Sequence, residues 1–170
     1  MAYSKNLEAL LAQERALTWP GSFGAHDALA LGHAVADLAA EYDRGVGLRI
    51  YREADELVLF QWMMDDKTAR NLGFIDGKRE AARACGHASL WAWAEHEESG
   101  AWEELFCAAS SACPTGGAFP IRTSDGAWVA TVSLSGLHEG KDHELVVRAL
   151  CRALGKAYGS EVPIYPGAPR

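Results

Sequence analysis

Apolar side chains near the amino terminus recur at helical spacing. Within residues 26–45 they fall three and four positions apart, which predicts a helix with one buried face. The apolar stripe consists of Ala28, Leu31, Val35, Leu38 and Tyr42. A preceding helix is expected to begin at Ser4, a favourable N-cap residue, and to end in the Trp-Pro-Gly-Ser segment of residues 19–22.

Residues 46–52 and 56–64 have the pattern of two strands. In the first segment apolar residues alternate with polar or small ones, as in a half-buried strand. The second segment is rich in β-branched and aromatic residues. Because only residues 53–55 connect them, the two segments are predicted to pair as an antiparallel hairpin.

Residues 118–122 and 127–135 predict a second hairpin. The pair Asp125-Gly126 between them favours a tight turn. Pro120 has no N–H to donate to a sheet ladder, so its strand is expected at an edge of the sheet or at a bulge. Residues 110–117 are rich in Ser, Gly and Pro, and we expect them to form a loop.

Helices are predicted between and after the hairpins. One covers residues from about 65 to 84, and a second follows the break at Gly86 and runs to about residue 98. One or two further helical turns are expected in residues 101–109, and a last helix over about residues 141–156. Two hairpins separated by helices predict an α+β fold, with an antiparallel sheet on which the helices pack.

The chain is expected to form one domain over residues 1–156, followed by an extended tail over residues 157–170. A chain of 170 residues can bury a substantial core without disulfides or metals. The tail contains Pro163, Pro166 and Pro169, which favour an extended conformation.

The charge of the chain narrows the choice of partner. A net charge of −7 argues against nucleic acid, which requires a basic face, and against an anionic membrane surface. Charged residues interrupt the first 20 positions, so no signal peptide is expected, and no apolar run is long enough to span a bilayer. We therefore expect a cytoplasmic location, in which the four cysteines stay reduced.

The helix over residues 71–85 carries the first candidate site. One of its faces, at spacings of four and three, consists of Asn71, Ile75, Lys78, Ala82 and Cys85. Since a buried ammonium group requires a partner or an anionic ligand, Lys78 and the adjacent Arg79 predict an anion-binding pocket. The alternative is that Lys78 lies along the surface and pairs with Asp76 or Glu80.

The segment Gly86-His87-Ala88-Ser89 is the second candidate. A helix that begins here presents free backbone N–H groups, which can bind an anion. His87 at this position could transfer a proton or bind a metal. The alternative is a histidine that packs and hydrogen-bonds to the backbone.

The glycine pair Gly116-Gly117 is the third candidate. Two glycines allow backbone conformations that bring a ligand close to the main chain, and Phe119 would add an apolar wall. The pair lacks the Lys-Ser/Thr sequence that follows the glycines of a phosphate-binding P-loop, so that motif is rejected.

The last helix carries the fourth candidate. His143 lies on the apolar face of this helix and is therefore expected to point inward. Asp142 is expected to cap the helix, or else to orient a catalytic histidine. His138 and His143 do not have a recognised metal-ligand spacing, and no metal site is predicted.

Three tryptophans, Trp91, Trp93 and Trp102, lie close together in the sequence. Aromatic residues at such spacing more often form a core or a subunit interface than a ligand-binding box. We expect the tryptophans to serve as anchors of that kind.

Five segments, in this order, resemble the uncharacterised branch of the haem-degrading-domain (GlcG-like) superfamily. They are residues 27–32 (DALALG), Lys78-Arg79 with residues 86–89 (GHAS), residues 116–122 (GGAFPIR), residues 131–137 (TVSLSGL) and residues 142–147 (DHELVV). The resemblance implies a profilin-like α+β fold and assembly into homo-oligomers. It assigns no reaction.

Some relatives in the superfamily bind haem, so the resemblance makes haem a candidate cofactor. Thr115 stands where the branch usually has a histidine before the double glycine. Because a threonine hydroxyl is a poor iron ligand, haem bound here would lack an axial imidazole from this loop. His87 and His143 would remain as substitutes.

These observations favour a protein that binds a small anionic ligand. The residues expected to converge on one pocket are Asn71, Lys78, Arg79, His87, Gly116, Gly117, Phe119 and His143. Whether the chain is an enzyme stays open, since His87 or His143, oriented by Asp142, could act as general acid or base. The same residues are compatible with a haem or tetrapyrrole protein, and also with a scaffold protein whose interior is filled.

Overall fold

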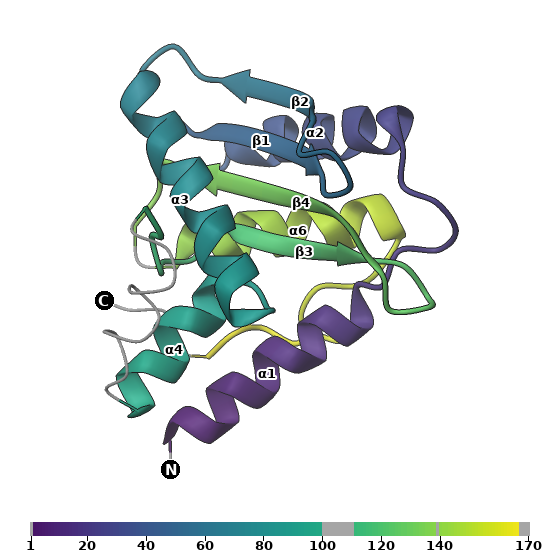
Figure 1. Ribbon diagram of the computed structural model, residues 1–170, viewed down its shortest axis with the longest axis vertical. Helices are drawn as coiled ribbons and strands as arrows, with labels where there is room; N and C mark the ends of the chain where they lie inside the picture. The colour runs from purple at the N-terminus through teal and green to yellow at the C-terminus, as the bar shows by residue number, and fades with distance from the viewer. Residues whose placement is uncertain (1, 100–110, 139, 167–170) are drawn as a thin grey trace.

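A computed structural model describes residues 2–99, 111–138 and 140–166. Figure 1 shows a sheet with helices packed on both of its faces. The helices are α1 (Ala2–Ala16), α2 (Ala25–Ala39), α3 (Ala69–Cys85), α4 (Ser89–Ser99) and α6 (Lys141–Leu154). The strands are β1 (Gly47–Arg52), β2 (Val58–Met63), β3 (Ala118–Arg122) and β4 (Trp128–Ser135).

The four strands lie in the order β2-β1-β4-β3, and each neighbouring pair is antiparallel. Both predicted hairpins form, and they join because β1 pairs with β4 along its whole length. β3 lies at an edge, as Pro120 predicted, because an edge strand can leave one side of its backbone without ladder bonds. The predicted α+β fold, with an antiparallel sheet built from two hairpins, is therefore confirmed.

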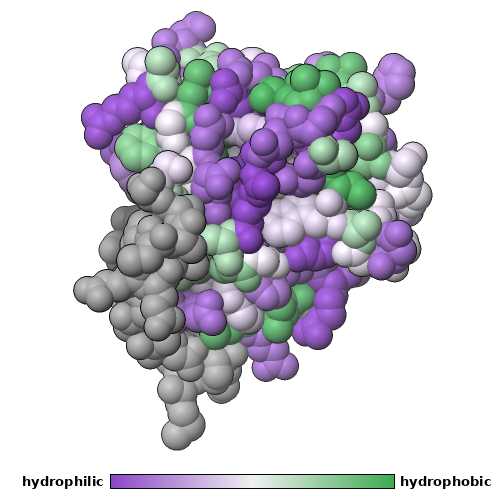
Figure 2. Space-filling model, viewed as in Figure 1, coloured by the Kyte–Doolittle hydropathy of each residue, from purple (hydrophilic) through white to green (hydrophobic). Residues whose placement is uncertain are grey.

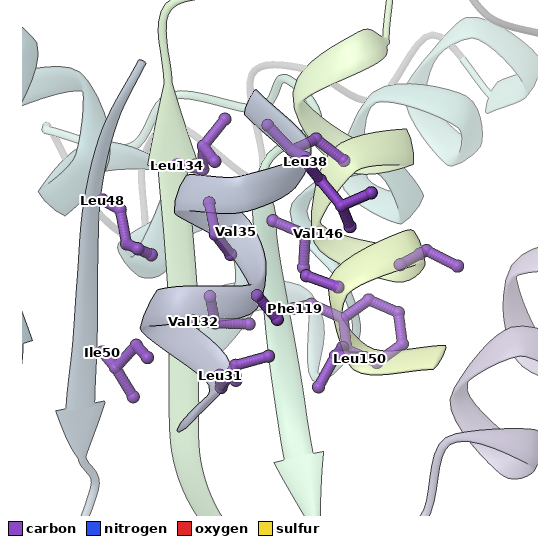
Figure 3. Packing of buried hydrophobic residues seen from close by; sticks show 14 of the residues in the cluster. Leu31, Val35, Leu38, Leu48, Ile50, Phe119, Val132, Leu134, Val146 and Leu150 are labelled. Atoms are coloured by element: carbon purple, nitrogen blue, oxygen red, sulfur yellow. The ribbon is translucent and has the colours of Figure 1, made fainter. Parts of the chain in front are cut away.

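The main core lies between the sheet and the two helices α2 and α6, which pack side by side on one face (Figure 1). Every second side chain of the two central strands points toward these helices, which the alternation in residues 46–52 predicted for β1. Figure 3 shows the strand residues Leu48, Ile50, Val132 and Leu134 meeting Leu31 and Val35 of α2 and Val146 and Leu150 of α6.

The opposite face of the sheet is polar and is covered by α3. The hydroxyl of Ser133 donates to the carbonyl of Ile75 at 2.7 Å, and both groups are buried. Gly77 allows the loop before β3 to lie directly on the helix, because a Cβ there would stand 2.7 Å from the carbonyl oxygen of Ser111. This loop and α3 together frame the site described below.

Helix boundaries differ from the prediction where capping decides them. α3 begins at Ala69 rather than near residue 65, because the Thr68 N–H donates to Asn71 Oδ1 at 3.1 Å in a capping box. α6 ends at Leu154 because Gly155 adopts the left-handed conformation (φ 65°). The helical turns predicted for residues 101–109 lie outside the described residues.

The segment after α6 folds back against α1, although the sequence suggested an extended tail. Val162 is buried, and the Gln13 amide nitrogen donates to the Pro163 carbonyl at 2.8 Å. Tyr165 packs against the small cluster of Leu10 and Leu90. No helix in the described parts of the chain is long and apolar enough to cross a membrane.

Candidate functional site

A cavity of about 490 Å³ lies beside α3, between the loop before β3 and the loop that joins β4 to α6. Its wall has a buried ion pair, a basic rim and an apolar side. Of the residues expected at a site, Asn71, Lys78, Gly116 and Asp142 line this cavity.

Lys78 and Asp142 form the buried polar part of the wall. The ammonium of Lys78 donates to Asp142 Oδ2 at 2.6 Å and to the Leu134 carbonyl at 3.0 Å. Both side chains are only 6% exposed. Lys78 is therefore partnered from α6, which is distant in sequence, rather than by its helical neighbours Asp76 and Glu80.

Asp142 does not cap α6, contrary to the prediction. The N-cap of that helix is Gly140, and Asp142 Oδ1 instead accepts the Leu137 N–H at 2.9 Å. Burial raises the pKa of Asp142, while the adjacent Lys78 ammonium acts in the opposite direction. Because both carboxylate oxygens are engaged in this way, Asp142 orients neither His87 nor His143.

The double glycine brings the loop close to other protein atoms. A Cβ at Gly117, whose φ is 137°, would stand 2.3 Å from the Leu134 carbonyl oxygen and 3.0 Å from the Lys78 ammonium. A Cβ at Gly116 would stand 3.0 Å from the Cβ of His143. The sequence suggested that the glycines let a ligand approach the main chain, but at Gly117 it is Lys78 and β4 that approach it. Of the two glycines, only Gly116 lines the cavity.

The rim of the cavity is basic and includes Arg44, Lys67 and His138. Arg44 Nη1 lies 2.6 Å from His138 Nε2. Since a guanidinium can only donate, this ring nitrogen accepts, and the neutral imidazole carries its proton on Nδ1. Lys67 lies 3.3 Å from Asp66, whereas Arg44 has no carboxylate within ion-pair distance in the described parts of the chain.

The remaining wall is apolar and is formed by Phe74, Leu90, Trp93 and Leu137. Leu90 and Leu137 are buried, but Phe74 is 40% exposed. Both Trp91 and Trp93 pack against the small cluster of Leu10 and Leu90, as expected for core residues, and Trp93 also lines the cavity. Trp102 lies outside the described residues.

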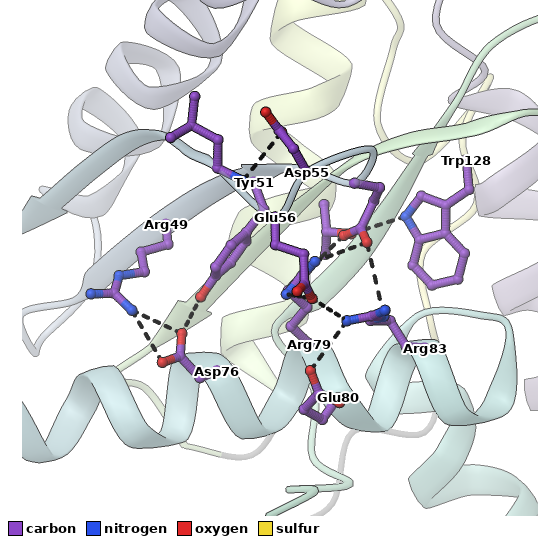
Figure 4. A network of polar contacts seen from close by, with 12 residues as sticks. Arg49, Tyr51, Asp55, Glu56, Asp76, Arg79, Glu80, Arg83 and Trp128 are labelled. Atoms are coloured by element: carbon purple, nitrogen blue, oxygen red, sulfur yellow. Dashed lines mark hydrogen bonds and ion pairs between the residues drawn. The ribbon is translucent and has the colours of Figure 1, made fainter. Parts of the chain in front are cut away.

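Arg79 lies away from this cavity, in a polar network between α3 and the first hairpin. Figure 4 shows the guanidinium of Arg79 among Tyr51, Glu56 and Arg83. Its Nε and Nη2 donate to the two oxygens of Glu53, each at 2.9 Å, and its Cζ atom lies 4.5 Å from the ring centre of Tyr51. A bidentate pair of this kind fastens the helix to the sheet.

His87 also lies away from the cavity. Its Nδ1 is 2.9 Å from Glu14 Oε2, and its ring packs against Trp91 at 4.3 Å between centroids. The other oxygen of Glu14 accepts the Ala88 N–H at 2.7 Å. A carboxylate from α1 therefore already occupies the start of α4, where the sequence suggested an external anion.

His143 and Phe119 belong to the interior. His143 is 2% exposed, and its Nε2 lies 2.7 Å from Gln13 Oε1. Burial lowers the pKa of His143 to about 3, so the ring is neutral. Phe119 is 1% exposed and lies 5.9 Å from the His143 ring. Of the eight residues expected to converge on one cavity, five do not line it: Arg79, His87, Gly117, Phe119 and His143.

No feature of the sequence indicates the basic rim. Arg44 and Lys67 lie in the connections before β1 and α3, where no periodicity shows which way a side chain points. Cys113, which also lines the cavity, is marked in the sequence only by its position beside a loop. Within residues 2–99, 111–138 and 140–166, no group of three or more His, Cys, Asp or Glu side chains is arranged to hold a metal ion.

Proteins of similar sequence cover almost the whole chain. A UPF0303 protein of Burkholderia mallei (strain NCTC 10229) is 29% identical over 162 residues, which cover 94% of this chain and 96% of that protein. A UPF0303 protein of Paraburkholderia phytofirmans is 29% identical over 160 residues, which cover 93% and 95%.

Solved structures share the fold at lower identity. The crystal structure of the Ybr137w protein has a TM-score of 0.78 at 22% identity, over 89% of this chain and 90% of that one. The crystal structure of a PduOC:haem complex has a TM-score of 0.62 at 19% identity, over 77% and 94%. That of HbpS has a TM-score of 0.60 at 17% identity, over 81% and 94%.

The family model described as "Haem degrading protein HbpS-like" matches residues 23–151. This range begins just before α2 and ends within α6, so it contains the entire sheet and the described wall of the cavity. The chain therefore belongs to the HbpS-like family of haem-degrading proteins.

Proposed function

We propose that the cavity binds a small organic anion. The observation that carries the proposal is the basic rim, and above all Arg44, whose guanidinium has no carboxylate partner in the part of the chain that the structure describes. Arg44 and Lys67 would hold the anionic group by charge-assisted hydrogen bonds. Phe74 and Trp93 offer apolar surface to the rest of the ligand.

Lys78 has a different part in this proposal from the one the sequence suggested. Its charge is neutralised by Asp142 at 2.6 Å, and an incoming anion would meet that carboxylate as well. Lys78 therefore holds the wall of the cavity in shape, and the rim supplies the attraction for the ligand.

Isothermal titration calorimetry with benzoate tests the proposal, with uncharged benzamide as the matched ligand. Benzoate is expected to bind more tightly than benzamide, and Arg44→Ala is expected to weaken benzoate binding by about tenfold. Arg15→Ala, at the exposed end of α1, is the control and should change nothing. Equal affinities for benzoate and benzamide in the unaltered protein would contradict the proposal.

Haem is the second candidate ligand, because a structural relative is described as a complex with haem. Arg44 and Lys67 fit the carboxylates of such a ligand, and Phe74 and Trp93 fit its faces. An axial ligand fits less well. The cavity wall offers His138, but its Nε2 already accepts from Arg44 and its Nδ1 carries the proton.

The two histidines expected from the sequence as axial substitutes do not reach the cavity. His87 is held by Glu14, and His143 is enclosed in the interior with its Nε2 beside Gln13. Within the residues that the structure describes, no histidine therefore offers a free ring nitrogen to the iron of a haem in this cavity.

Catalysis by His87 or His143 also loses support. The two side chains and Asp142 do not share one cavity, and the imidazole of His143 has a pKa of about 3 because of burial. A general base acts near its own pKa, so His143 is poorly matched to neutral conditions. Binding rather than catalysis is the function that the geometry supports best.

We also propose that the chain self-associates, through the free edge of β2. The sequence of this strand, VLFQWM, has neither the charges nor the proline that protect an exposed edge. Leu57 and Val58 are 49% and 37% exposed, and Figure 2 shows hydrophobic residues gathered near the upper edge of the view, where β2 lies. Light scattering should give a multiple of 18.3 kDa that Val58→Lys reduces, and a monomer mass at micromolar concentration would contradict the proposal.

A further inference from the structure

A second hollow, of about 440 Å³, adjoins the cavity. The two share Phe74 and Cys113, so that the exposed phenyl ring stands on the boundary between them. Arg70, Gly73 and Pro114 also line the second hollow. A ligand long enough to pass over Phe74 would occupy both.

Gly73 keeps the second hollow open. It lies inside α3, where glycine is less favourable than alanine because it gains more backbone entropy on unfolding. A Cβ at this position would meet nothing within 4 Å, so no protein atom in the described parts of the chain requires a glycine there. The missing side chain instead leaves space above the helix, beside Phe74.

Arg70 places a positive charge at the second hollow. Its guanidinium lies 5.5 Å from the centre of the Phe74 ring, in a cation–π arrangement, and it forms no ion pair in the described parts of the chain. The first cavity has its own cation in Arg44, which has no ion-pair partner among the described residues. The combined site thus has a cation in each half and an apolar ring between them.

We infer that the two hollows form one bipartite site for an elongated dianion, such as a dicarboxylate with an apolar middle. Arg44 and Lys67 take one anionic group, Phe74 contacts the apolar middle, and Arg70 takes the second anionic group. This inference rests on the proposed function of the first cavity, and it adds the length and the charge number of the ligand.

The test measures binding of a series of dicarboxylates from succinate to sebacate by isothermal titration calorimetry. Octanoate and decanoate serve as monoacids of matching length. We expect the affinity to rise to an optimum within the series and to exceed that of the monoacid of equal length by about fivefold or more, since a second charge-assisted contact forms.

Two variants locate the second anionic group. Arg70→Ala should remove most of the advantage of the dicarboxylate over the monoacid of equal length. Gly73→Leu should fill the second hollow and lower the affinity for long dicarboxylates by about tenfold, whereas Gly73→Ala is the matched control with a single added methyl group. Circular dichroism of each variant verifies that the fold is retained.

The outcomes separate this inference from the proposed function. Octanoate binding that depends on Arg44, with no gain for any dicarboxylate, overturns the bipartite site and leaves the anion-binding cavity intact. A gain that survives both Arg70→Ala and Gly73→Leu also overturns it. Absence of binding by every acid in the series overturns the bipartite site, and the titration with benzoate then decides the proposed function separately.

Discussion

Lys78 and Asp142 form a 2.6 Å ion pair that joins the middle of α3 to the first turn of α6 across the wall of the cavity. Both side chains are almost completely removed from solvent. Each partner makes a further hydrogen bond, Lys78 to the Leu134 carbonyl and Asp142 to the Leu137 N–H, and such bonds help two buried charges to be tolerated. The shape of the site therefore depends on a contact between residues 64 positions apart.

Replacing one partner of this ion pair should destabilise the protein more than replacing both partners. Lys78→Met leaves an unpaired buried carboxylate, and the free energy of unfolding should fall by about 3–5 kcal/mol. The double variant Lys78→Met/Asp142→Leu should recover a large part of that loss, because it leaves no buried charge. Urea unfolding followed by circular dichroism measures both, and a single variant within about 1 kcal/mol of the unaltered protein would count against the pair's importance.

The buried imidazole of His143 should make stability depend on pH. Its pKa is about 3 in the folded chain, whereas the unfolded chain has the ordinary value of 6.5. Between these values the unfolded state binds a proton that the folded state does not. The contribution of His143 to the free energy of unfolding is therefore fully present above pH 6.5. It decreases by about 1.4 kcal/mol per pH unit as the pH falls from 6.5 toward 3.

Chemical denaturation at several pH values between about 4.5 and 7 tests this slope. His143→Gln cannot titrate, so its stability should vary less with pH than that of the unaltered protein over the same range. His26→Gln, at the exposed start of α2, is a matched control and should retain the slope. Equal slopes for the unaltered protein and His143→Gln would show that other groups cause the pH dependence.

Replacement of glycine by alanine should change the free energy of unfolding in opposite directions at two positions. Gly73→Ala should raise the free energy of unfolding by about 0.5–1 kcal/mol, because it restores helix propensity without a steric conflict. Gly117→Ala should lower it by more than about 2 kcal/mol, because its φ is 137° and the new methyl group would meet the Leu134 carbonyl at 2.3 Å. Thermal unfolding of both variants measures the contrast, which similar shifts of the same sign would refute.

Haem titration should not give a strong low-spin bis-histidine spectrum. The His138 imidazole that lines the cavity is engaged by Arg44, and the loop before β3 carries Thr115 instead of an imidazole. Thr115→His would place a ring at the cavity wall and should strengthen haem binding. A sharp low-spin spectrum of the unaltered protein that is lost in His138→Ala would show that the Arg44–His138 contact yields to iron.

The sequence determined the elements and the class of fold. Alternation in residues 46–52 and the turn signal at residues 125–126 identified strands whose buried faces now meet α2 and α6, and the helical stripe from Ala28 to Leu38 is buried as predicted. Pro120 indicated an edge strand by its missing N–H alone. Such features follow from local geometry, since the periods of helix and strand are fixed by the backbone.

The site was decided by tertiary structure. Periodicity placed Lys78 and His143 on buried faces, but it contained no information on which residue from another element would meet them, and their partners proved to be Asp142 and Gln13. Arg44 and Lys67 lie in connecting segments, where the sequence has no periodic pattern that predicts the direction of a side chain. A long-range pair forms because the sheet and its helices bring two distant segments together, and that arrangement depends on the whole fold rather than on the residues near either partner.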